Sequence, residues 1–148
     1  MRNKCQFDEK QILDRGKAFQ AGFLAAIITT CATYFLTDVC RVSIASFSLF
    51  LISLWIPITV CFILLITKDA YENVNSSIGK TILSIYGLAG LFILGSTLFS
   101  IFVGKEHFLK NGTFSDSLGH IVTAICMITT CVTYWVKRCI NARKYRDE

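Results

Sequence analysis

Four long apolar stretches divide the chain, and short polar segments separate them. They cover residues 18–37, 42–67, 81–104 and 118–136, and none of them contains Asp, Glu, Lys or Arg. Because an α-helix rises about 1.5 Å per residue, roughly twenty apolar residues cross the ~30 Å hydrocarbon core of a bilayer. Apolar solvent offers backbone groups no partner, so such stretches adopt helices. The pattern predicts an all-α integral membrane four-helix bundle that forms a single domain over residues 1–148.

The arm before the first stretch, residues 1–17, interleaves apolar and charged side chains. Phe7, Ile12 and Leu13 alternate with acidic and basic residues, which is typical of a helix lying in the membrane interface. We therefore expect a short amphipathic N-terminal helix that leads into the first span. A solvated basic flank that only fixes the topology is the alternative. At the other end, residues 137–148 form a basic tail.

Basic residues are distributed unevenly between the polar segments. The chain has 15 Lys and Arg against 10 Asp and Glu, a net charge of +5. Most of the basic residues lie in the arm, the middle loop and the tail, and those flanking the spans are Arg15, Lys17, Lys137 and Arg138. The positive-inside rule then places both termini in the cytoplasm. The charge favours a bilayer with anionic headgroups as partner, and not nucleic acid, because no folded basic face is expected.

Small residues recur at helical spacing within the first, third and fourth spans. Such residues let helix backbones approach closely, and Ser or Thr hydroxyls can bond across the contact. The pattern predicts helix packing, within the bundle or in a homo-oligomer, and is weaker support for a transport path. The predicted packing residues are Ala18, Gly22, Ala26, Thr30, Gly87, Gly90, Gly119, Thr123, Thr130 and Thr133.

Pro57 lies in the middle of the second span. Proline removes one backbone hydrogen bond and bends a helix. We therefore predict a kink at Pro57. A kink can act as a gate, but we favour a static bend.

One seven-residue motif occurs twice along the chain, with one difference between the copies. Residues 28–34 read ITTCATY, and residues 128–134 read ITTCVTY. Because the first and fourth spans run in opposite directions, the copies are antiparallel. We interpret them as two Thr-rich packing faces, or as a pair that meets across an oligomer, rather than as one split site.

Residues that carry chemistry are scarce. A proton-coupled carrier needs a titratable group at mid-depth, and the seven cysteines include no Cys-x-x-Cys pair, so we expect them to act as small hydrophobes. Four outer-loop residues are conceivable metal ligands, but no recognised spacing joins them; they are Glu106, His107, Asp116 and His120. We therefore expect no catalytic residue, no metal and no cofactor.

The sequence DEKQILDRGKAFQAGF, residues 8–23, resembles the start of small uncharacterised four-span membrane proteins of Gram-positive bacteria. KDAY at residues 68–71 is also similar, and beyond these motifs the likeness is one of topology. The resemblance implies a bacterial cell membrane and transfers no activity, because that family has none established. The residues that match the N-terminal motif, DE(K/R)Q…RGK, are Asp8, Glu9, Gln11, Arg15, Gly16, Lys17 and Gly22.

Together these patterns favour a non-enzymatic multi-pass membrane protein that acts as an accessory or oligomerising subunit. Its partner is a second copy or another membrane protein. The alternative is a small transporter or pore-forming subunit without intramembrane charges, which the hydroxyl-bearing stripes and Pro57 also suit. A membrane enzyme would have to use the four outer-loop residues.

Overall fold

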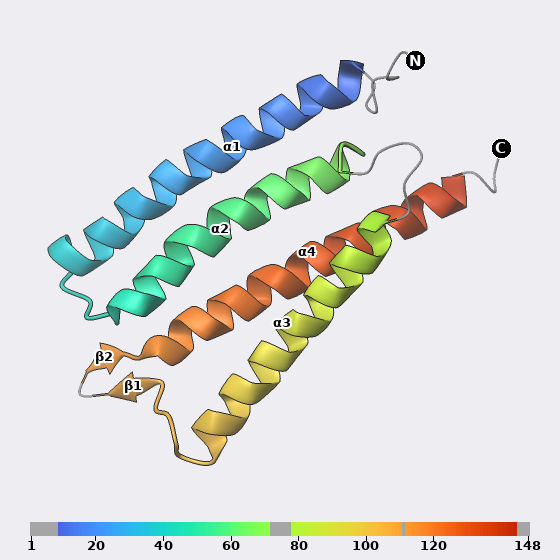
Figure 1. The fold of residues 1–148 in the computed structure, drawn as a ribbon. Helices are drawn as coiled ribbons and strands as arrows, with labels where there is room; N and C mark the ends of the chain where they lie inside the picture. Colours follow the sequence, from blue (N-terminus) through green and yellow to red (C-terminus); the bar gives the residue numbers. More distant parts are fainter. Residues whose placement is uncertain (1–8, 72–77, 111, 145–148) are drawn as a thin grey trace, which may run out of the picture.

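Four helices dominate the computed structural model, which describes residues 9–71, 78–110 and 112–144 of the chain (Figure 1). A π-helical segment continues the first helix, and two short strands pair as an antiparallel hairpin before the last helix. The elements are α1 (Glu9–Tyr34), η1 (Phe35–Val39), α2 (Ser46–Thr67), α3 (Ile78–Phe102), β1 (Leu109–Lys110), β2 (Thr113–Phe114) and α4 (Asp116–Lys144).

All four helices are long and apolar enough to cross a membrane. Mean hydropathy over the most apolar window is highest in α2, at 2.8, and falls to 1.5 in α1 and α4. The lower values follow from polar residues within the apolar stretches, such as Gln20 in α1 and His120 in α4. The prediction of four such helices is confirmed.

The helices pack in the order α1–α2–α4–α3; α1 and α2 are antiparallel, as are α4 and α3, whereas α2 and α4 run parallel (Figure 1). Across this row, the rings of Trp55 and Phe62 on α2 lie 6.1 and 6.4 Å from the ring of Tyr86 on α3. Helices α2, α3 and α4 therefore form the compact part of the bundle. Helix α1 lies along the outer side of α2, and only 6% of its apolar window is buried, against 39% for α4.

The expected short N-terminal helix is continuous with the first span. Helix α1 begins at Glu9 and continues through Arg15, Gly16 and Lys17 without interruption. The physical reason is that an unbroken helix keeps its backbone hydrogen bonds, whereas a break would leave several groups to be satisfied by other partners. Phe7 lies outside the described residues. At the other end, α4 likewise continues past Val136 into the basic tail.

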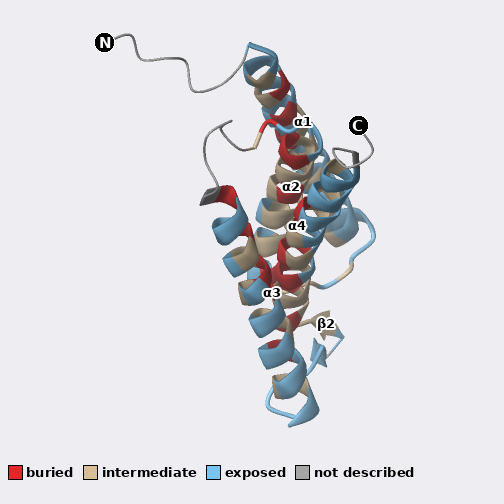
Figure 2. Cartoon of the chain, turned by 90° about the vertical axis from the view of Figure 1, so that its right-hand side faces the viewer, coloured by how far each residue is buried: buried red, intermediate tan, exposed pale blue. Residues whose placement is uncertain are grey.

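Burial in this bundle is reversed with respect to a water-soluble domain. Small and hydroxyl-bearing side chains such as Ser48, Thr123 and Thr130 are buried, and Figure 2 shows the buried positions where helices face one another. Large apolar side chains point outward instead: Phe92 is 77% exposed and Phe102 is 89% exposed. Close backbone approach at small residues therefore builds much of the core, beside buried large side chains such as Leu65, Ile66 and Tyr134.

Candidate functional site

The contact between α1 and α2 is built on one face of α1. Asp14, Ala18 and Gly22 follow one another at intervals of four residues, and they are the buried residues of this helix. A Cβ atom at Gly22 would lie 3.0 Å from Cβ of Cys61 and 3.5 Å from the carbonyl oxygen of Pro57. The absence of that Cβ therefore lets α1 lie directly on the middle of α2.

Helix α2 continues through Pro57, which is buried against this contact. The helix assignment is unbroken from Ser46 to Thr67. Lacking an N–H, the proline leaves a backbone carbonyl of the preceding turn without its usual donor. The structure thus places Pro57 in a helix contact as well as inside a helix.

A second glycine contact joins α3 to α4. A Cβ atom at Gly87 would lie 2.5 Å from Sγ and 2.7 Å from Cβ of Cys131, and one at Gly90 would lie 2.9 Å from Cβ of Met127. Real Cβ atoms essentially never show contacts this short. Both glycines thus serve as holes for side chains of α4.

The third contact joins α2 to the start of α4. A Cβ atom at Gly119 would lie 2.8 Å from Cα of Ser48. The Ser48 hydroxyl accepts a hydrogen bond from the Gly119 N–H at 3.0 Å and donates one to the Ser115 carbonyl at 2.8 Å. The first turn of a helix has unsatisfied N–H groups. Ser48 therefore caps α4 from a neighbouring helix, a role for which the local sequence of α4 gives no signal.

Three threonines of the predicted packing set, all on α4, bond within their own helix. Thr123, Thr130 and Thr133 each donate to the carbonyl four residues earlier in α4. Their hydroxyls are therefore satisfied inside their own helix, and Thr123 and Thr130 contribute to the contacts as small buried side chains. On α1, Ala26 is half-buried and Thr30 is exposed, so the predicted stripe is buried at Ala18 and Gly22 and uncovered further along.

The two copies of the repeated motif occupy different environments. Thr130 is buried and Cys131 packs into Gly87, whereas Thr30 and Cys31 are exposed. Helix α2 lies between α1 and α4 in the row. Within the described part of the chain, the copies therefore do not form one site.

The four loop residues considered as metal ligands lie in different surroundings. Glu106 accepts a hydrogen bond from Ser117 at 2.7 Å, and the His120 ring lies 5.7 Å from the ring of Phe47. His107 is exposed, and Asp116 is exposed in the first turn of α4, where its charge suits the helix dipole. Residues 9–71, 78–110 and 112–144 contain no group of three or more His, Cys, Asp or Glu side chains that could hold a metal ion.

The opposite end of the bundle carries a polar junction centred on Asp69. Its carboxylate accepts from Nζ of Lys137 at 3.1 Å and from Nδ2 of Asn141 at 3.3 Å. Its carbonyl accepts from Nε2 of Gln11 at 3.0 Å, and Lys137 also donates to the Thr67 carbonyl at 2.9 Å. The junction thus connects α1 and α4 through the end of α2. In the sequence, Lys137 indicated only topology, because nothing local links it to a residue after α2.

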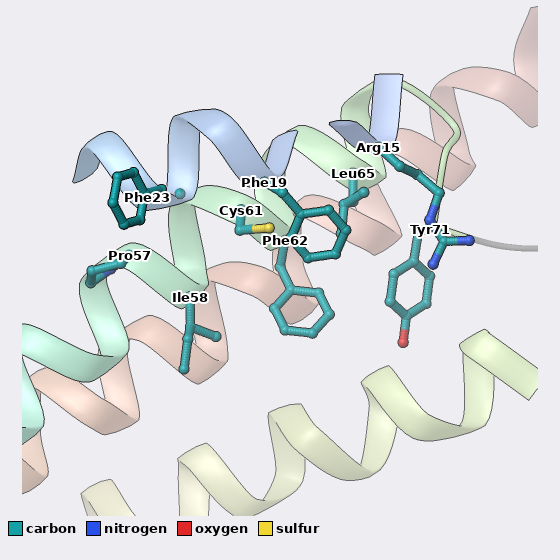
Figure 3. Close-up of a pocket in the computed structure, with 10 residues that line it drawn as sticks. Arg15, Phe19, Phe23, Pro57, Ile58, Cys61, Phe62, Leu65 and Tyr71 are labelled. Atoms are coloured by element: carbon teal, nitrogen blue, oxygen red, sulfur yellow. The ribbon is translucent and has the colours of Figure 1, made fainter. Parts of the chain in front are cut away.

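A groove of about 440 Å³ lies between α1 and α2 at this same end of the bundle (Figure 3). Its walls are mostly apolar, and Arg15 and Tyr71 lie together at one end of it. The sequence could not reveal the groove, since its walls come from segments that are distant along the chain. The residues that line it are Arg15, Phe19, Gly22, Phe23, Pro57, Ile58, Cys61, Phe62, Leu65 and Tyr71.

Comparison of the chain with protein-family models, with curated proteins and with solved structures found no match. The geometry itself thus provides the features from which function can be argued. They are three glycine-mediated helix contacts, a sparsely buried outer helix, and a groove with one cationic end.

Proposed function

We propose that the chain is a non-enzymatic multi-pass membrane protein that acts as an oligomerising or accessory membrane subunit. The observation that carries the proposal is the state of α1. This helix buries Asp14, Ala18 and Gly22, while its stripe of small residues continues to the exposed Thr30. A helix with a small-residue face left uncovered is suited to packing against another membrane helix.

Membrane insertion is supported by the outward-facing side chains. Large exposed apolar residues such as Phe92, Phe99 and Phe102 cover the outer surface of α3. In water, contiguous apolar surfaces of this kind are costly, whereas in a bilayer they contact lipid. Because the start of α1 and the end of α4 lie at the same end of the bundle (Figure 1), the basic flanks at both termini favour one side of the membrane, which the positive-inside rule makes the cytoplasm.

The membrane that we propose is a bacterial cell membrane. This part rests on the resemblance of residues 8–23 to membrane proteins of Gram-positive bacteria. Anionic headgroups at the cytoplasmic face would meet Arg15, Lys17 and Arg138, each contributing on the order of 1 kcal/mol to the attraction.

The proposal is tested by oxidative crosslinking of two native cysteines in membranes. Cys31 is exposed on α1 next to Thr30, and Cys126 is buried in α4. In variants that keep one cysteine and carry Ala at the other six positions, we expect the Cys31 chain to form disulfide-linked dimers and the Cys126 chain to remain monomeric. The Cys126 chain controls for crosslinking through unfolded protein, because its thiol is buried in the folded chain.

A different result would remove the oligomerising role. The Cys31 chain would remain as monomeric as the Cys126 chain, and purification in mild detergent would yield a monomer without a membrane-protein partner. A second test measures ion and solute flux in reconstituted vesicles. Flux above that of empty vesicles would favour a transporter or pore over an accessory subunit.

A further inference from the structure

We propose that the groove between α1 and α2 binds one acyl chain of an anionic phospholipid, whose phosphate pairs with Arg15. This inference rests on the membrane insertion proposed above and adds a defined ligand site to it. The occupant is a lipid of the leaflet that faces the Arg15 end of the bundle.

The body of the groove is apolar. Phe19 and Phe23 rise from α1 on one side, and Ile58 and Phe62 rise from α2 on the other (Figure 3). Gly22 adds no side chain to the space between them. Among the residues that line the groove, Arg15 is the one with a charged side chain. The body therefore suits a hydrocarbon chain and the end suits an anion.

The groove has the size of a ligand site. From Arg15 to Phe23, α1 advances eight residues, which is about 12 Å. The volume of about 440 Å³ lies in the range of about 300–1,000 Å³ common for ligand sites. An extended acyl chain can follow a groove of this length from the cationic end along the apolar walls.

The charge at the end of the groove is positive. A guanidinium group has five N–H donors in a planar fork, so it can bind two oxygens of a phosphate and still keep another partner. Arg15 is the charged residue among those that line the groove, so an anionic headgroup complements this end.

The depth of Arg15 also matches a headgroup. Arg15 lies three residues before the first apolar stretch of the chain, which begins at Ala18. The interface between headgroups and hydrocarbon lies at that level for a helix that crosses the membrane. The phosphate would thus contact Arg15, and the acyl chain would extend from there along the apolar walls.

The test measures which lipids remain with the purified protein. The full-length chain is reconstituted in vesicles with equal parts of phosphatidylglycerol and phosphatidylcholine, extracted with mild detergent, and analysed for bound lipid by native mass spectrometry. We expect the wild-type protein to retain phosphatidylglycerol preferentially. Arg15→Gln should lower the ratio of bound phosphatidylglycerol to phosphatidylcholine about five-fold, the effect of one cation near the headgroups.

Two further variants show whether the groove holds the lipid. Lys17→Gln removes the same charge from an exposed residue that does not line the groove, so it should lower the ratio clearly less than Arg15→Gln does. Ile58→Trp fills the groove and should reduce the bound amount of both lipids. Circular dichroism and elution volume identify any variant that fails to fold, and in that case Ile58→Phe replaces Ile58→Trp.

Each alternative outcome is distinguishable. Equal ratios for Arg15→Gln and Lys17→Gln, or full lipid retention by Ile58→Trp, would overturn the lipid site. A further outcome is that Ile58→Trp abolishes the Cys31-linked dimer and leaves lipid retention unchanged. That result would assign the groove to a second copy of the chain and would also overturn the lipid site. If the wild-type chain were released from membranes by alkaline carbonate, the proposed membrane insertion itself would fail.

Discussion

Replacing Gly87 by Ala should weaken the contact between α3 and α4. The new methyl group would lie 2.5 Å from Sγ and 2.7 Å from Cβ of Cys131, so the sulfur cannot solve the clash by rotation alone. One of the two helices must move, and Gly90 lies on the same face, already close to Met127. The perturbation thus acts on the closest of the glycine contacts in the described part of the chain.

The expected magnitude follows from two opposing contributions. Inserting a methyl group into a packed contact costs about 1–3 kcal/mol. Ala in place of Gly in a helix returns up to about 1 kcal/mol through helix propensity. We therefore expect Gly87→Ala to lower the free energy of unfolding by up to about 2 kcal/mol, which corresponds to up to roughly 8 °C in Tm for a chain of this size.

The control is Gly95→Ala on the same helix. No atom lies within 4 Å of a Cβ built at Gly95, so this substitution retains the propensity gain without the clash. Thermal unfolding in detergent, followed by circular dichroism, should show Gly95→Ala at or above the wild-type Tm. In the double variant Gly87→Ala/Cys131→Gly, both clashing atoms of Cys131 are gone. The double variant should therefore lose less unfolding free energy than the two single variants lose together.

The reasoning would be refuted by equal Tm values for Gly87→Ala and Gly95→Ala. Purely additive behaviour of Gly87→Ala and Cys131→Gly would have the same consequence. Either result would mean that α3 and α4 do not approach one another at this glycine.

Three further substitutions test other contacts. Ser48→Ala removes the cap of α4 and should cost about 0.5–2 kcal/mol of unfolding free energy, whereas Ser46→Ala, at an exposed position of the same helix, should change thermal unfolding little; equal effects would exclude the cap. Lys137→Gln breaks the ion pair with Asp69, whose side chains are 27% and 60% exposed, so it should cost less than about 1 kcal/mol, and the loss should shrink in high salt; a salt-independent loss would contradict the electrostatic account. Thr30→Val should weaken the crosslinked dimer while Thr130→Val leaves it intact, because Thr130 is buried and bonded within α4; a reversed order on non-reducing gels would show that the wrong face was assigned.

The sequence contains much of the helix packing in its spacing of small residues. Ala18 and Gly22 are four residues apart, so they must share a face of α1, and the structure buries both. Asp14 extends that same face by one turn and is buried too. Because Asp14 is charged and lies near basic residues, its type indicates an exposed polar position. Its spacing from Ala18 and Gly22, however, already placed it on the buried face.

What could not be predicted are the pairings between distant segments. That Gly87 faces Cys131, or that Ser48 caps α4, depends on which helices are neighbours, and the period of one helix contains no such information. The row order and the groove beside Gly22 follow from the same pairings. The threonine hydroxyls were also ambiguous, because a bond within the helix and a bond across helices need the same residue at the same spacing.

The central claim is a chain that crosses the membrane with both ends in the cytoplasm, and the native cysteines Cys40 and Cys139 test it most directly. Both are exposed, one after η1 and the other near the end of α4. Variants that keep one of these cysteines are expressed in bacterial cells and treated with a membrane-impermeant maleimide. The account predicts that Cys40 is labelled in intact cells and that Cys139 is labelled only after permeabilisation. Labelling of Cys139 in intact cells, or protection of Cys40 until the cells are opened, would contradict it.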